Sequence, residues 1–199
     1  MKITLIILAS SAGLFIIIQI YLTMASSGTQ SQPYKLISTE KNFEIRFYPA
    51  ATVATISSSA KTYKELGNSG FRKLAGYIFG GNKENTKIAM TAPVHMDIND
   101  SASSMSFVMP KGYTKENLPK PNEPDVTIRE TPDEYVAAIK FSGFASDESI
   151  QLNTEILEAA LKEKSISYYG HFRFLGYNPP FQLLGRRNEI IVNINWSSK

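Results

Sequence analysis

The sequence of 199 residues contains no cysteine and only two histidines. Without cysteine the protein has no disulfide, no thiol nucleophile, no thiolate ligand for a metal and no cysteine-based zinc site. Two histidines are too few for a histidine-rich metal centre. Because a cysteine-free fold can exist on either side of a membrane, this absence leaves the compartment open.

Signatures of nucleic-acid binding and of the common enzyme classes are also missing. The formal net charge is only +3, and no run of lysine and arginine alternates with aromatic residues, so we expect no nucleic-acid partner. The sequence has no Gly-x-Ser-x-Gly elbow, phosphate-binding loop or dinucleotide fingerprint. Carboxylates on strands, such as Glu189, usually face water. We therefore predict that the protein is not an enzyme.

The N-terminus is uncharged over a long stretch. Residues 3–24 carry no charged side chain, and as a helix they would span about 33 Å, enough for a bilayer core of about 30 Å. This pattern predicts a transmembrane anchor at residues 1–25 with Met1 and Lys2 in the cytoplasm, and an extracytoplasmic C-terminal domain. A cleaved signal sequence is the alternative and predicts a secreted or periplasmic protein. Residues 26–33 are small and polar, which predicts a flexible tether.

The remaining residues, 34–196, contain an internal repeat. Residues 45–54 match residues 128–137, with Ile, Arg, Pro, Val and Ala in register. Each copy predicts a strand, a proline break, a second strand and then a helix, at 62–79 and 147–164, followed by further extended segments. Two ββαββ units with pseudo-twofold symmetry indicate an α+β fold, in which a distorted antiparallel β-barrel or sheet is flanked by two helices.

The first predicted helix is rich in glycine. Gly67, Gly70 and Gly76 each cost about 1 kcal/mol relative to alanine in a helix interior. Close packing of the helix on the sheet would offset this cost. A flat ligand lying against the helix would do so as well, and the sequence alone leaves both interpretations open.

Four short motifs resemble those of one protein family. They are Glu-Ile-Arg-Phe-Tyr at 44–48, Lys-Ile-Ala-Met-Thr-Ala-Pro-Val at 87–94, Gly-Tyr-Asn-Pro-Pro at 176–180 and Gly-Arg-Arg-Asn-Glu at 185–189. In this order they resemble the signature of the SOUL/p22 haem-binding proteins, and the similarity covers about residues 34–194. The resemblance implies a barrel built from a pseudo-twofold repeat that binds haem or another tetrapyrrole. It also implies a fold similar to bacterial effector-binding modules.

The resemblance also implies a binding patch between the first helix and the loop after the Gly-Tyr-Asn turn. The apolar positions of this patch are Phe71, Leu74, Ala75, Ile78, Phe181 and Leu183. Arg72 and Arg186 are the nearby cations that we expect to hold propionates. One branch of the family has a histidine in its first-strand motif as the proposed iron ligand, whereas this sequence has Phe47 there.

The iron ligand is therefore not assigned. His95 and His171 are the histidine candidates, although isolated histidines more often lie at the surface or at a strand edge. The predicted function is a membrane-anchored, non-enzymatic haem or tetrapyrrole carrier that serves in buffering, storage or transfer. The alternative is a protein-interaction or small-molecule sensor module that has kept the fold and lost its affinity for haem.

Overall fold

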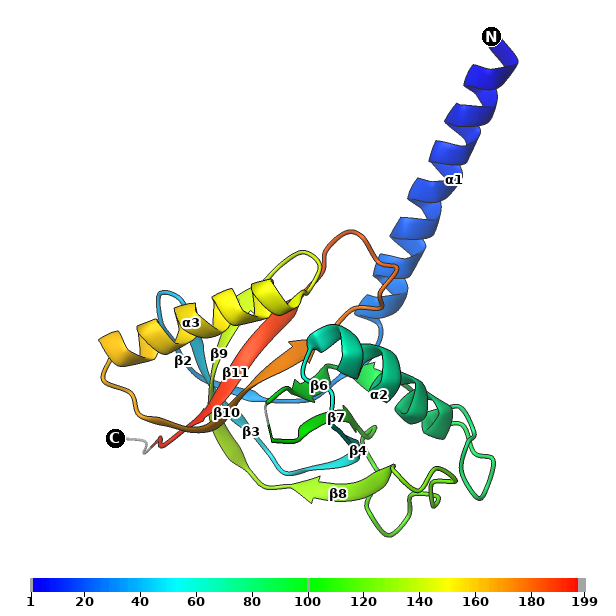
Figure 1. Ribbon diagram of the computed structural model, residues 1–199. Coiled ribbons are helices and arrows are strands. Elements are labelled where there is room, and N and C mark those ends of the chain that lie inside the picture. The colour runs from blue at the N-terminus through cyan, green and yellow to red at the C-terminus, as the bar shows by residue number, and fades with distance from the viewer. Residues whose placement is uncertain (1, 100, 197–199) are drawn as a thin grey trace.

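A computed structural model describes residues 2–99 and 101–196 (Figure 1). The helices of this part of the chain are α1 (Lys2–Ser27), α2 (Tyr63–Ile78) and α3 (Asp147–Glu163). The strands are β1 (Gln30–Ser31), β2 (Lys35–Thr39), β3 (Glu44–Tyr48), β4 (Ala51–Ser58), β5 (Thr91–Ala92), β6 (Val94–Asp97), β7 (Ser103–Val108), β8 (Thr127–Thr131), β9 (Glu134–Phe141), β10 (Tyr168–Gly176) and β11 (Asn188–Ile194). A nine-stranded antiparallel sheet has the order β2-β3-β9-β11-β10-β6-β7-β4-β8, and β1 pairs in parallel with β5.

The order of strands shows how the two halves of the chain combine. The first half supplies β3, β4, α2, β6 and β7, and the second half supplies β8, β9, α3, β10 and β11, as the ββαββ repeat predicts. The equivalent strands of the two halves are β3 and β8, β4 and β9, β6 and β10, and β7 and β11. From β3 to β8, equivalent strands lie at equal distances from the middle of the sheet. The pseudo-twofold axis therefore passes between β6 and β10. Each half also pairs its first strand with the other half, since β3 joins β9 and β8 joins β4.

The sheet is curled but open, which corrects the predicted barrel. Strands β2 and β8 lie at opposite ends of the strand order, whereas closure of a barrel would require the two end strands to pair. The fold is an α+β half-barrel, and the described chain contains three helices instead of two flanking helices and a membrane span (Figure 1).

The predicted transmembrane anchor is wrong as well. Within residues 2–99 and 101–196, none of the helices combines the length and the apolar character that a membrane crossing requires. Although α1 is long, serine, glutamine and threonine residues interrupt its apolar run. Near its C-terminal end, the buried Gln19 accepts a hydrogen bond from the Leu183 amide, so this part of α1 packs against the domain. The predicted single-pass location and the extracytoplasmic C-terminal domain both depended on this anchor, so neither is supported.

Helices α2 and α3 cover the same face of the sheet and share one core. Helix α2 packs against β4 and β7, and α3 packs against β9, β10 and β11. Leu66 and Leu74 of α2 and Leu157 and Leu161 of α3 are buried in one hydrophobic cluster. Both helices begin at capping residues, as their sequences favour: Thr62 accepts from the Glu65 amide, and Ser146 forms a capping box with Ser149.

The opposite face of the sheet carries a smaller apolar cluster. Its buried members are Tyr48, Val136, Ala138, Leu175 and Ile191. Alternation along β3 separates the two faces, because Ile45 belongs to the helix-covered core whereas Arg46 points to the other side with Tyr48. This second face positions the polar network described below.

Candidate functional site

The predicted α2 side of the binding patch is mostly core. Leu74, Ala75 and Ile78 are buried, so a ligand at the surface would not reach them without displacing other side chains. Phe71 is 39% exposed, and its ring meets the ring of Phe107 edge-on with 5.3 Å between centroids. Arg72 is exposed on the same helix. Of the α2 residues in the patch, Phe71 and Arg72 are therefore the accessible ones.

The glycines of α2 were predicted to allow either close packing on the sheet or contact with a flat ligand, and their surroundings in the structure differ. A Cβ atom on Gly70 would lie 2.7 Å from Cδ1 of Ile56, so this glycine allows close packing on β4. A Cβ atom on Gly67 or Gly76 would have no neighbour within 4 Å. Packing thus explains Gly70, whereas Gly67 and Gly76 leave open surface.

The loop side of the patch is exposed and is held by α1. Phe181 is 58% and Leu183 is 44% exposed. The amide of Gln19 donates to the Phe181 carbonyl at 3.4 Å, and its Oε1 accepts from the Leu183 amide at 3.0 Å. The loop therefore rests beside the end of α1, while Phe71 packs over β7. Exposed apolar side chains therefore lie on α2, at Phe71, and on the loop, at Phe181 and Leu183.

Arg186 is anchored within the same loop. Its Nη1 donates to the carbonyls of Pro179 and Gln182 at 2.8 and 2.7 Å, and its guanidinium lies 4.5 Å from the ring centre of Phe144. Burial lowers the pKa of Arg186. Among the described side chains its Nε is a buried nitrogen that makes no hydrogen bond. This unused donor is shielded from solvent, so a ligand at the surface would not reach it without rearrangement of the loop.

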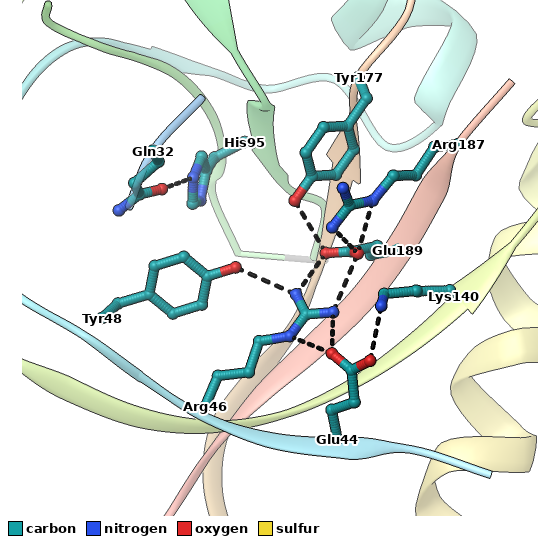
Figure 2. Close-up of polar contacts among 9 residues, drawn as sticks. All are labelled: Gln32, Glu44, Arg46, Tyr48, His95, Lys140, Tyr177, Arg187 and Glu189. Atoms are coloured by element: carbon teal, nitrogen blue, oxygen red, sulfur yellow. Dashed lines mark hydrogen bonds and ion pairs between the residues drawn. The ribbon is translucent and has the colours of Figure 1, made fainter. Parts of the chain in front are cut away.

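A buried ion-pair network lies on the second face of the sheet (Figure 2). Arg46 and Glu189 are fully buried and form a bidentate pair, with Nη1–Oε2 and Nη2–Oε1 distances of 2.7 and 3.0 Å. Nε of Arg46 also donates to Glu44 at 2.8 Å, and Nζ of Lys140 donates to the same carboxylate at 2.6 Å. The guanidinium and carboxylate geometries match, which gives the pair its two parallel hydrogen bonds.

Two further residues complete the network around Glu189. The hydroxyl of Tyr177 donates to Glu189 at 2.9 Å, and Nη2 of Arg187 donates to it at 2.6 Å (Figure 2). Burial opposes the charge on Arg46, but its hydrogen bonds and attraction to Glu189 outweigh burial and raise its pKa. Burial, and then the negative charge of Glu189, raise the pKa of Tyr177. These groups therefore stay charged or protonated and act as structure.

The network corrects the expectation that strand carboxylates face water, because Glu189 is fully buried. Apart from Lys140, its members come from three of the four motifs: Glu44 and Arg46 from 44–48, Tyr177 from 176–180, and Arg187 with Glu189 from 185–189. The charged residues of the network were visible in the sequence within these motifs. Their pairing could not be predicted from the pattern of a single strand, because Arg46 and Glu189 are 143 positions apart in the sequence.

His95 lies in a small polar cleft on this second face. The cleft has a volume of about 70 Å³ and includes Arg129, Glu134 and Arg173. Nε2 of His95 lies 2.7 Å from Oε1 of Gln32 (Figure 2), so the ring donates this hydrogen bond, since a carbonyl oxygen only accepts. Burial, and then repulsion by Arg173, lower the pKa of His95 to about 3. A nitrogen engaged in this way is not free to bind a metal.

A larger groove lies between α3 and the strands near the pseudo-twofold axis. Its volume is about 420 Å³. Most of its lining is apolar: Met96, Ile98, Ile150, Tyr168, Phe172, Phe174 and Ile190. Its other residues are Asn99, Thr154, Gly170 and His171. His171 is a predicted candidate for the iron ligand, but the groove could not be predicted from the sequence, because its walls meet only when α3 packs on β10.

Multi-ligand metal binding finds no support in the part of the chain that the structure describes. There, no group of three or more histidine and acidic side chains is arranged to hold a metal ion. A cofactor that brings its own metal and needs one protein ligand is compatible with this arrangement.

Comparisons with known proteins agree with the motifs. The family model described as SOUL heme-binding protein matches residues 29–193. Heme-binding protein 2 of Mus musculus is 34% identical over 158 residues, which cover 75% of this chain and 76% of that protein. Heme-binding protein 1 of Xenopus laevis is 27% identical over 175 residues, or 82% of this chain and 91% of that protein.

A solved structure shares the fold. The crystal structure of the EcmrR C-terminal domain matches with a TM-score of 0.60 and 10% sequence identity, over 82% of this chain and 99% of that domain. At this identity the similarity concerns the fold alone. The family model and the murine relative decide the identity: this chain belongs to the SOUL heme-binding protein family.

Proposed function

We propose that this protein binds haem or another tetrapyrrole reversibly, without catalysing a reaction. The observation that carries the proposal is the family match over residues 29–193, together with 34% identity to a murine protein named heme-binding protein 2. Reversible binding suits a role in buffering, storage or transfer of the ligand.

The chemistry of the described residues fits such a ligand. A porphyrin needs a large apolar surface and often one axial ligand to its iron. The groove of about 420 Å³ supplies an apolar wall and an imidazole. The surfaces at Phe71 and at Phe181 with Leu183 supply exposed apolar area elsewhere. When bound, haem would bring an iron centre.

The patch implied by the family motifs remains our proposal for one contact surface. Phe71, Phe181 and Leu183 are accessible there, with Leu74, Ala75 and Ile78 behind Phe71 in the core. Arg72, which is exposed, and Arg186 are the cations that we propose for the propionates.

Titration of the full chain with haem, followed by absorbance of the Soret band, tests the proposal. We expect a saturable shift that ends near one equivalent. Phe71→Asp and Phe181→Asp should each weaken binding if the patch contributes, whereas Leu36→Asp changes an equally exposed apolar residue on β2 and should not. No saturable shift up to tens of micromolar haem would refute haem binding and favour the interaction or sensor module.

A further inference from the structure

The groove between α3 and β10 contains a histidine with a defined set of neighbours. The side chain of His171 is 57% exposed, and its Nδ1 lies 3.5 Å from Oδ1 of Asp97. The same nitrogen lies 3.3 Å from Nδ2 of Asn99. Which of these contacts carries the proton decides which ring nitrogen has a free lone pair.

The orientation of the Asn99 amide is fixed by the backbone. Its Oδ1 accepts from the amides of Ser101 and Ala102 at 3.0 and 2.9 Å, so the oxygen and nitrogen cannot be exchanged without losing both bonds. Its Nδ2 donates to Oδ1 of Asp97 and to the carbonyl of Ala102, each at 3.0 Å. An amide nitrogen has two protons, and both are used.

Nδ1 of His171 therefore lies between Asp97 and Asn99, and both amide protons of Asn99 have other acceptors. In the neutral tautomer that carries its proton on Nδ1, on the side of the Asp97 carboxylate, Nε2 has the free lone pair. Histidines that bind metals usually donate the other ring N–H to a carboxylate or carbonyl, which fixes the ring and raises the basicity of the ligating nitrogen. The Asp97 carboxylate lies beside Nδ1 of His171, where such a supporting group would be.

The groove has the size and character for the flat part of a porphyrin. Its volume of about 420 Å³ lies in the usual range for small-molecule sites, about 300–1,000 Å³, and such sites are mostly apolar with few polar groups. Its aromatic walls include Phe172 and Phe174 on β10, and Ile150 on α3 faces them.

We propose that haem iron is bound by Nε2 of His171 in the groove between α3 and β10, with Asp97 as the positioning residue. This inference rests on the proposed haem-binding function. Phe47 lies where one branch of the family has its proposed iron ligand, but its side chain cannot bind iron. A histidine from the second half of the chain takes that role here. The ligand sits on the helix-covered side of the sheet, away from the Arg46–Glu189 network.

The absorption spectrum of the haem complex of the full chain tests the assignment. His171→Ala should remove the spectrum of histidine-ligated haem and lower the affinity at least about tenfold, and added imidazole should restore the spectrum. Asp97→Asn should keep the ligand and weaken binding by about 10–100-fold, as lost carboxylate support does at metal sites. His95→Gln is the matched control, because it replaces the other histidine and should leave the spectrum unchanged.

A second variant tests the groove itself. Thr154→Trp places a large side chain in the groove from α3 and should reduce haem binding, while Phe181→Asp reports on the loop surface in parallel. A wild-type spectrum and affinity in His171→Ala, or unaltered binding in Thr154→Trp, would overturn the inference and leave haem binding itself intact. Absence of saturable binding in the unmodified chain would instead refute the proposed function.

Discussion

Gly67 and Gly70 lie on the same helix, but an added methyl group would meet different surroundings. At Gly67 it would meet open space, whereas at Gly70 it would lie 2.7 Å from Ile56 Cδ1 and 3.4 Å from the sulfur of Met105. We expect Gly67→Ala to raise the free energy of unfolding by up to about 1 kcal/mol through helix propensity. Gly70→Ala should lose this gain, because overpacking in a core costs about 1–3 kcal/mol.

Urea unfolding of both variants measures the difference. A Gly70→Ala protein more stable than Gly67→Ala would show that Ile56 moves aside at little cost. If Gly67→Ala is more stable but binds haem less tightly, the open glycine surface of α2 also contacts the ligand.

His95 should make folding stability depend on pH. Its pKa in the folded protein is lowered to about 3, below the ordinary value of 6.5, so the unfolded chain binds a proton that the folded chain excludes. The stability that neutral His95 allows is therefore complete above about pH 6.5 and is lost as the pH falls toward 3. We expect the melting temperature to fall between pH 7 and 5, less steeply in His95→Gln. Parallel curves for the two proteins would contradict this origin.

At the level of elements, the side chain of Gln19 links α1 to the loop after β10. Gln19 bonds to the carbonyl of Phe181 and the amide of Leu183. We expect Gln19→Ala to release the loop, so that the Leu183 amide exchanges its hydrogen faster with solvent. Tyr21→Ala is the control, since Tyr21 is exposed on the same helix. Unaltered exchange at Leu183 in Gln19→Ala would mean that other contacts hold the loop.

The sequence predicted elements better than it predicted their contacts. The repeat at 45–54 and 128–137 predicted both ββαββ units, because proline breaks and the alternating pattern of strands are local features of the sequence. The apolar run at 3–24 was misread, since local hydropathy does not reveal that Gln19 is buried against the 181–183 loop.

The same limit applies to the candidate site. Phe71 and Phe181 were identified from motifs, but their exposure depends on packing. His171 was named as a candidate, whereas its relation to Asp97 is invisible in the sequence because it arises where β10 lies beside β6. Glu189 was misassigned because alternation along a strand indicates two faces without telling which of them is covered.

At the level of the whole molecule, the Arg46–Glu189 pair connects the two halves of the chain. Arg46 lies on β3 and Glu189 on β11, and neither side chain reaches water. Removing one member leaves the other charge buried without its partner, which typically costs about 3–5 kcal/mol. We therefore expect Arg46→Met to lower the free energy of unfolding by about that amount.

Chemical denaturation of Arg46→Met, of Glu189→Gln and of the double variant Arg46→Met/Glu189→Gln measures this cost. The double variant should regain part of the loss, because the orphaned carboxylate is gone. Strictly additive effects of the two changes would show that the pair is not energetically coupled.

The exchange of strands between halves has a consequence for how the chain folds. Strand β3 pairs with β9, and β4 pairs with β8. These partners follow about 70 to 95 residues later in the sequence, as in Glu44 with Ala138 and Thr55 with Thr127. Closing such long loops before any contact rewards them slows folding. A ribosome that has released only the first half has therefore made a segment with unsatisfied strand edges, and the domain becomes native only once nearly the whole chain has emerged.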